Sequence, residues 1–128
     1  MAYYFTKIVS YSFDQAIERA KEELQKEGFG VLTEVDVTAT LKAKLGVDFR
    51  KYRIIGACNP LFAHMALLEE DKIGTMLPCN LIVQEHQNGS VEVSAINPTE
   101  TMHAIKNSSL SDIAGNVTKK LQKIINNL

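Results

Sequence analysis

The segment YRIIGACNP, residues 52–60, contains a strand followed at once by the start of a helix. Residues 52–58 alternate between two sets that fall on opposite faces of an extended chain, as expected for a β-strand. Asn59 is a favoured helix N-cap and Pro60 a favoured first helical residue. The segment therefore predicts a strand that ends at Cys58 and a helix that runs from Pro60 to about Leu68.

Similar patterns on either side of this segment predict the other strands. Aromatic and β-branched residues favour a strand at 4–9, and alternation favours one at 30–36. Two further strands, 80–85 and 90–96, flank Asn88-Gly89, the preferred pair for a type I′ hairpin turn. Residues 74–79 are expected to be a connector.

Helix signals lie between and after the strands. Ser12 and Gln15 have the spacing of a capping box, and Gly28 is a suitable left-handed cap at the end of that helix. A short helix is expected at 37–45, and a long one is expected to begin near Ser109 and continue to the end of the chain. The stretch 98–107 has no clear pattern.

This order of elements predicts one α+β domain over residues 1–128. Its sheet should be mostly antiparallel, with about five strands in the order β-α-β4-α. Two long helices should pack on one face of the sheet, because each has one apolar side to bury. The short helices are inserted between strands.

Composition excludes several classes of protein. The 128 residues carry 14 Lys and Arg against 15 Asp and Glu, a net charge of -1, so no global positive field is available to hold nucleic acid or an anionic membrane. No apolar run approaches the ~20 residues of a membrane span. The N-terminus lacks the pattern of a signal peptide, and two cysteines are too few for a disulfide scaffold. We expect a cytoplasmic protein that binds neither nucleic acid nor membrane.

Cys58, His64 and Cys79 form the first candidate site. Thiolate and imidazole are ligands that zinc or copper prefers, and neighbouring strands would bring both cysteines to one end of the sheet. The spacing matches no standard zinc module. The alternative is that both thiols are small buried hydrophobes and that His64 bonds to the backbone.

The same region suggests two other kinds of chemistry. Cys58 precedes a predicted helix N-terminus, which favours a reactive thiolate that His64 could assist, although no third residue is evident as an orienting group. Asn59 and Asn80 could instead bind an anion or a polar small molecule beside the free amides of that helix. Helix capping by Asn59 and turn formation by Asn80 are the simpler explanations.

Several motifs recur in the order of a known family: GFGVLTE at 28–34, ATLK at 39–42, LGVDF at 45–49, GACNP at 56–60 with AH at 63–64, and LPCN at 77–80. The chain resembles the domain of unknown function 302 family over almost its whole length. The resemblance implies a compact α+β domain whose saddle-like sheet is similar to TATA-binding-protein-like folds. It also implies a homodimer, which an incompletely covered sheet would favour, and it implies no established activity.

These observations predict a homodimeric small-ligand-binding or interaction module. Its predicted site is a polar pocket formed by Cys58, Asn59, His64, Cys79 and Asn80. The alternatives are a metal-binding protein that uses Cys58, His64 and Cys79, and a thiol-dependent enzyme.

Overall fold

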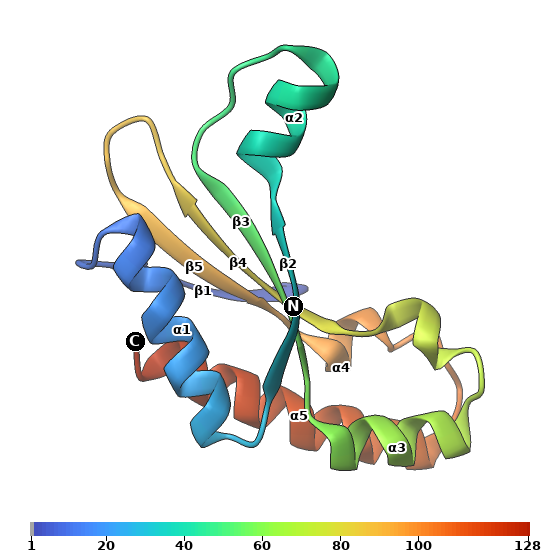
Figure 1. The fold of residues 1–128 in the computed structure, drawn as a ribbon. Coiled ribbons are helices and arrows are strands. Elements are labelled where there is room, and N and C mark those ends of the chain that lie inside the picture. The colour runs from blue at the N-terminus through green and yellow to red at the C-terminus, as the bar shows by residue number, and fades with distance from the viewer. Residues whose placement is uncertain (1) are drawn as a thin grey trace.

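A computed structural model describes residues 2–128, which form a five-stranded antiparallel sheet with helices at its side and end (Figure 1). The strand order is β1-β5-β4-β3-β2. The strands are β1 (Tyr4–Val9), β2 (Gly30–Asp36), β3 (Tyr52–Cys58), β4 (Cys79–Glu85) and β5 (Val91–Ile96). The helices are α1 (Phe13–Lys26), α2 (Val37–Leu45), α3 (Pro60–Glu69), the 3₁₀ helix η1 (Ile73–Met76), α4 (Pro98–Thr101) and α5 (Ser108–Asn126). The predicted α+β domain is confirmed.

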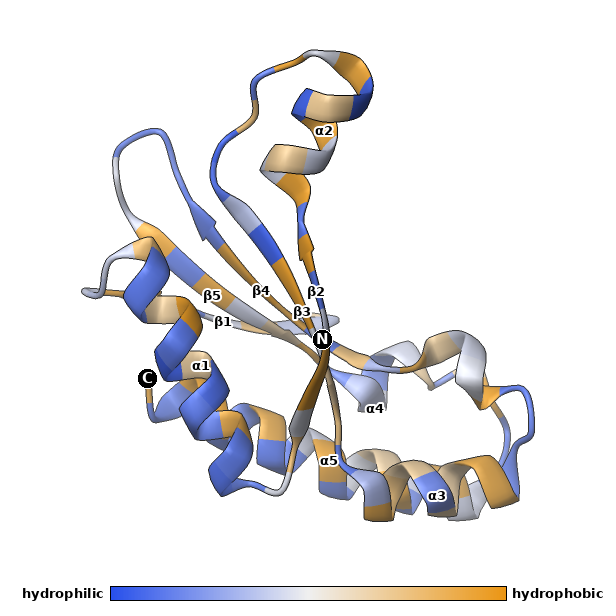
Figure 2. Ribbon diagram, viewed as in Figure 1, coloured by the Kyte–Doolittle hydropathy of each residue, from blue (hydrophilic) through white to orange (hydrophobic). Residues whose placement is uncertain are grey.

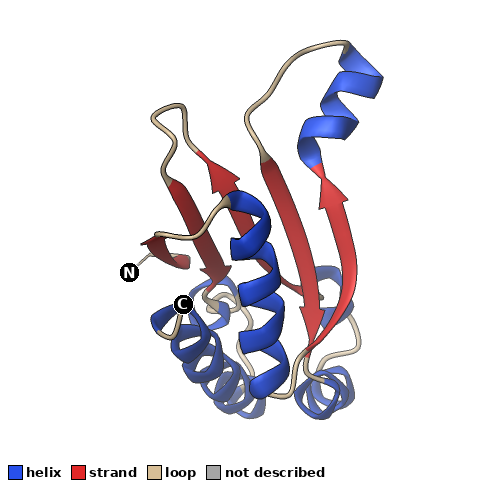
Figure 3. Cartoon of the chain, turned by 60° about the vertical axis from the view of Figure 1, so that its left-hand side comes forward, coloured by secondary structure: helices blue, strands red, loops and turns tan. Residues whose placement is uncertain are grey.

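The core lies between one face of the sheet and the helices α1 and α5 (Figure 3). The alternation of the strands decides which side chains face the helices: Ile55 and Ala57 from β3, Leu81 and Val83 from β4, and Val93 and Ala95 from β5, all buried. Leu24 of α1 and Leu121 and Ile124 of α5 meet them and are fully buried. Burial of each large side chain contributes roughly 1.5–3 kcal/mol, so this layer supplies most of the stability.

The first helix begins and ends as its sequence predicts. Ser12 caps the amide of Gln15, whose side chain bonds in return to the amide of Ser12. Gly28, just beyond the helix, has a φ of 84°, a left-handed conformation that favours glycine. The α1–β2 connection is therefore tight, which matters below because Asn59 packs on it.

The hairpin turn between β4 and β5 differs from the prediction. A type I′ turn needs positive φ at both central residues, but only Gly89 has a positive φ (87°), and no residue other than glycine does so within residues 2–128. The bonds from the Gly89 amide to the His86 carbonyl and from the His86 amide to the Ser90 carbonyl define a three-residue loop closed by a left-handed glycine. The Asn88 side chain instead accepts bonds from Ser90.

The last helix begins at Ser108, one residue before the predicted start near Ser109. Its N-cap is Asn107, whose side chain accepts from the amides of Ser109 and Leu110. The unpatterned stretch before it contains the short helix α4, and η1 lies in the predicted connector.

The segment β2–α2 projects from the body of the protein (Figure 1). All seven residues of β2 are exposed, and α2 buries none of its side chains. No helix within residues 2–128 is long and apolar enough to cross a membrane.

Candidate functional site

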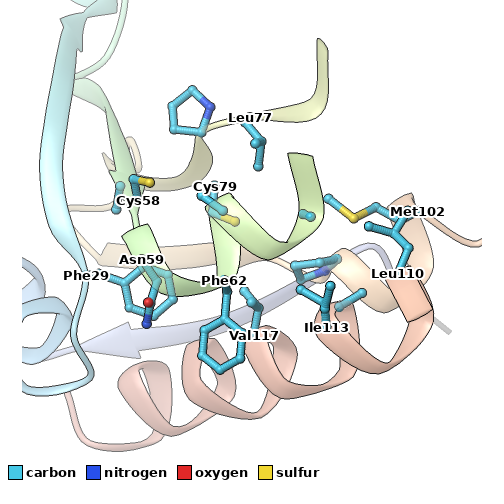
Figure 4. Close-up of a pocket in the computed structure, with 16 residues that line it drawn as sticks. Phe29, Cys58, Asn59, Phe62, Leu77, Cys79, Met102, Leu110, Ile113 and Val117 are labelled. Atoms are coloured by element: carbon cyan, nitrogen blue, oxygen red, sulfur yellow. The ribbon is translucent and has the colours of Figure 1, made fainter. Parts of the chain in front are cut away.

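The two cysteines lie at the same end of adjacent strands. Ala57 is the antiparallel partner of Cys79, so Cys58 is one residue beyond the cross-strand neighbour of Cys79. This is the juxtaposition on which the predicted site depends. Helix α3 starts directly after Cys58, and α5 packs against α3, so a pocket is enclosed at this end of the sheet (Figure 4).

The pocket is apolar, which corrects the predicted polar character. The cavity inside it has a volume of about 40 Å³. Of the 16 residues around it, Asn59 alone has a side chain with nitrogen or oxygen. The others include Phe62 and Ala66 from α3, and Ile113, Ala114 and Val117 from α5.

The thiols of Cys58 and Cys79 both line this pocket but differ in exposure. Cys79 is 8% exposed and Cys58 is half-buried. Burial away from water disfavours the thiolate and, with a smaller contribution from the nearby Cys58 thiol, raises the pKa of Cys79 to about 11. Cys79 therefore lies in an environment that keeps it a neutral, apolar wall of the pocket.

The side chain of Asn59 makes a hydrogen bond other than the predicted helix cap. It occupies the N-cap position of α3, yet its side chain makes no capping bond. Its Nδ2 atom instead donates to the Glu27 carbonyl at 3.3 Å, and a Cβ atom added at Gly28 would lie 3.3 Å from the same Nδ2. Asn59 thus connects the end of α1 to the start of α3, so it fixes one wall of the pocket.

His64 and Asn80 do not line this pocket. His64 is exposed on α3, whereas Phe62, Ala63 and Ala66 of the same helix border the cavity. Asn80 follows Cys79 in β4, and the alternation of the strand places it on the opposite face, where it is exposed. The proposed ligands Cys58, His64 and Cys79 are therefore not brought together, and residues 2–128 contain no group of three or more His, Cys, Asp or Glu side chains that could hold a metal ion.

A polar network on the open face of the sheet was missed from the sequence. Glu92 lies at its centre: Oε1 accepts from Gln84 at 3.4 Å and faces His86 Nε2 at 2.9 Å, and Oε2 accepts from the Thr6 hydroxyl at 2.7 Å. These bonds, first that from Thr6 and then that from His86, lower the pKa of Glu92, so the carboxylate is ionised at neutral pH. Arg50 Nε donates to Gln84 Oε1 at 2.9 Å and extends the network.

Comparison with known proteins gives the family but no activity. A family model described as "Domain of unknown function DUF302" matches residues 5–128. The crystal structure of an uncharacterized conserved DUF302 protein from Bacillus stearothermophilus is similar, with a TM-score of 0.91, 34% sequence identity and 98% of each chain covered. No curated protein matches the chain.

Proposed function

The chain belongs to the DUF302 family, and from that premise we propose that it is a small-ligand-binding protein whose ligand inserts a short apolar group into the pocket beside Cys58 and Cys79. The observation that carries this proposal is the apolar lining of the cavity. Small cavities with apolar walls stay dry, because a water molecule inside would lose its hydrogen bonds. An alkyl group entering such a space displaces no ordered water and gains dispersion contacts on all sides.

The size of the cavity limits the ligand. About 40 Å³ exceeds the roughly 10–15 Å³ that one water needs but is far below an engineered cavity of ~150 Å³ that holds benzene. The buried group is therefore a short alkyl chain or a chain terminus. The rest of the ligand would lie outside the cavity, beyond the reach of its apolar walls.

Xenon is a suitable probe of this pocket, because it is apolar and binds in dry apolar cavities. We expect methyl resonances of Leu110, Ile113 and Val117, which line the cavity, to shift under xenon pressure. Ala114→Val adds two methyl groups to the buried wall and should abolish these shifts. Two-dimensional ¹H–¹³C spectra recorded with and without xenon measure the effect.

Ala43→Val is the matched control, since Ala43 is an exposed helical alanine of α2. It should leave the xenon shifts unchanged. Wild-type spectra without xenon shifts at these methyl groups, or shifts that persist in Ala114→Val, would contradict the proposal.

The homodimer is supported by the exposed side of α3. Leu61, Met65 and Leu68 follow one another at helical spacing and are 64%, 40% and 74% exposed, and Met76 on η1 is exposed as well. No charged side chain occurs in α3 before Glu69, and the helix is coloured as largely hydrophobic in Figure 2. An uncharged apolar stripe can pack against its own copy around a two-fold axis with no charge repulsion, so we propose that a second copy covers it.

Sedimentation equilibrium tests this interface. The wild type should have about twice the 14.2 kDa mass of one chain at micromolar concentration. Leu68→Glu should reduce the mass to that of one chain, because packing would bury an unpaired carboxylate. Leu45→Glu, at a similarly exposed leucine at the end of α2, should remain a dimer. A monomeric wild type, or dissociation by Leu45→Glu alone, would count against α3 as the interface.

A further inference from the structure

We propose a second ligand site in the hollow on the open face of the sheet, and we infer that it binds a neutral, polyhydroxylated ring, that is, a sugar. The hollow measures about 420 Å³, within the range of ligand pockets, and lies on the face opposite α1 and α5. Three tyrosines line it: Tyr3 and Tyr4 lie at β1, and Tyr52 lies in β3. No part of it is shared with the lining of the pocket beside Cys58 and Cys79.

Strand register explains why polar groups gather on its floor. Tyr52 of β3 is the partner of Gln84 of β4, and Gln84 is the partner of Glu92 of β5, so the three lie in one row. In the next row Ile82 lies opposite Ser94. Gln84 and Ser94 are each only 9% exposed, although no helix within residues 2–128 covers this face. A buried polar floor that is already fixed by hydrogen bonds needs little rearrangement when a ligand binds.

Glu92, the one charged side chain that lines the hollow, already has hydrogen-bond partners. Both oxygens of Glu92 have partners on Thr6, Gln84 or His86. Arg50 donates to the same Gln84 that bonds to Glu92, and its guanidinium lies over the rings of Phe49 and Tyr52 at 4.5 and 5.6 Å. Arg50 forms no ion pair within residues 2–128, but it does not line the hollow, so the lining presents no unpaired charge and favours a neutral ligand.

The groups without partners have the hydrogen-bonding character of a sugar's own hydroxyls. Within residues 2–128, Tyr11 has the one tyrosine hydroxyl that is hydrogen-bonded, so those of Tyr3, Tyr4 and Tyr52 remain available, as does the exposed Asn80 amide. Hydroxyl and amide groups both donate and accept, as sugar hydroxyls do. Aromatic rings supply apolar faces for the C–H groups of a sugar ring.

The arrangement of the rings favours a sugar over a nucleobase. The Tyr3 and Tyr4 rings are edge to face, with centroids 5.0 Å apart and planes at 74°. Such a pair offers no slot between parallel rings for a flat base. A sugar ring needs a single aromatic face and hydrogen bonds around its edge, which Ser94 and Asn80 can supplement.

Tyrosine fluorescence and saturation-transfer NMR test the proposal with methyl glycosides of glucose, galactose and N-acetylglucosamine, added at millimolar concentration to the full chain. The chain has 4 Tyr and no Trp, so three of its four fluorophores line the hollow. At least one glycoside should change the emission and receive saturation. Tyr4→Ala and Asn80→Ala should each weaken binding about tenfold, equivalent to ~1.4 kcal/mol.

Two variants serve as controls: Tyr11→Phe changes a tyrosine bonded to Arg19 of α1, and Ala114→Val fills the other pocket, so neither should alter sugar binding. The site proposal fails if no glycoside binds, or if adenosine binds in their place. It also fails if Tyr4→Ala converts a dimer into a monomer, since a second copy would then cover this face. Xenon shifts are independent of all these outcomes.

Discussion

Gly56→Ala is expected to destabilise the fold by about 3 kcal/mol, at the upper end of the range for overpacked sites, although alanine is usually the better strand residue. The reason is space: a Cβ atom at Gly56 would overlap Thr33 Oγ1 and lie 2.8 Å from Pro78 Cγ. Thr33 can rotate, but Pro78 is a ring fixed to the backbone just before β4. Either β2 or the segment leading into Cys79 must move, and urea unfolding measures the cost.

Gly30→Ala is the matched control, because a Cβ atom at Gly30 meets nothing within 4 Å. This change should be neutral or stabilise the protein by about 0.5 kcal/mol, since it reduces the freedom of the unfolded chain. Thr33→Ala combined with Gly56→Ala should recover part of the loss, because one of the two obstacles is removed. Equal stability of the Gly56→Ala and Gly30→Ala variants would show that the close approach over Gly56 does not exist in solution.

Strand positions could be predicted because the alternation is local. The predicted bounds of β1, β2 and β3 match the structure, and those of β4 and β5 differ by one residue at the start. Caps and turns were harder to predict than strands. Asn107, Ser109 and Asn88 all have short polar side chains that favour caps and turns, and tertiary contacts decide which of them takes which position. Asn107, for example, also donates from Nδ2 to the Glu69 carbonyl at the end of α3.

The site could be predicted only in part, and two omissions were avoidable. Alternation along β4 already places Cys79 and Asn80 on opposite faces, so Asn80 was not to be expected on the core side, where Cys79 is buried. The hairpin between β4 and β5 also places Gln84 opposite Glu92. The polar residues in the two strands were enough to predict this pair from the sequence. The orientation of His64 was not predictable, because α3 is apolar on nearly every side and its sequence does not show which side is buried.

Cys79 is expected to react with iodoacetamide at neutral pH at least about 100-fold more slowly than an ordinary exposed thiol. With its pKa raised by burial to about 11 from the ordinary thiol value of 9.0, its thiolate fraction at pH 7 is smaller by about that factor, and the thiolate is the nucleophile. The rate should rise about tenfold per pH unit up to pH 11. Mass spectrometry of Cys58→Ser, in which Cys79 is the remaining thiol, measures it directly.

The reciprocal variant, Cys79→Ser, leaves the half-buried Cys58 as the remaining thiol. At every pH below 11, Cys58 in this variant should react with iodoacetamide faster than Cys79 does in Cys58→Ser. His64→Ala should leave the Cys58 rate unchanged, because His64 is exposed on α3 outside the pocket. A slower Cys58 reaction in His64→Ala would show that the imidazole reaches the thiol in solution, and it would revive the thiol-dependent enzyme as an explanation of this site. Rapid modification of Cys79 near pH 7 would mean that the pocket opens to water, which its role as a dry apolar binding site does not allow.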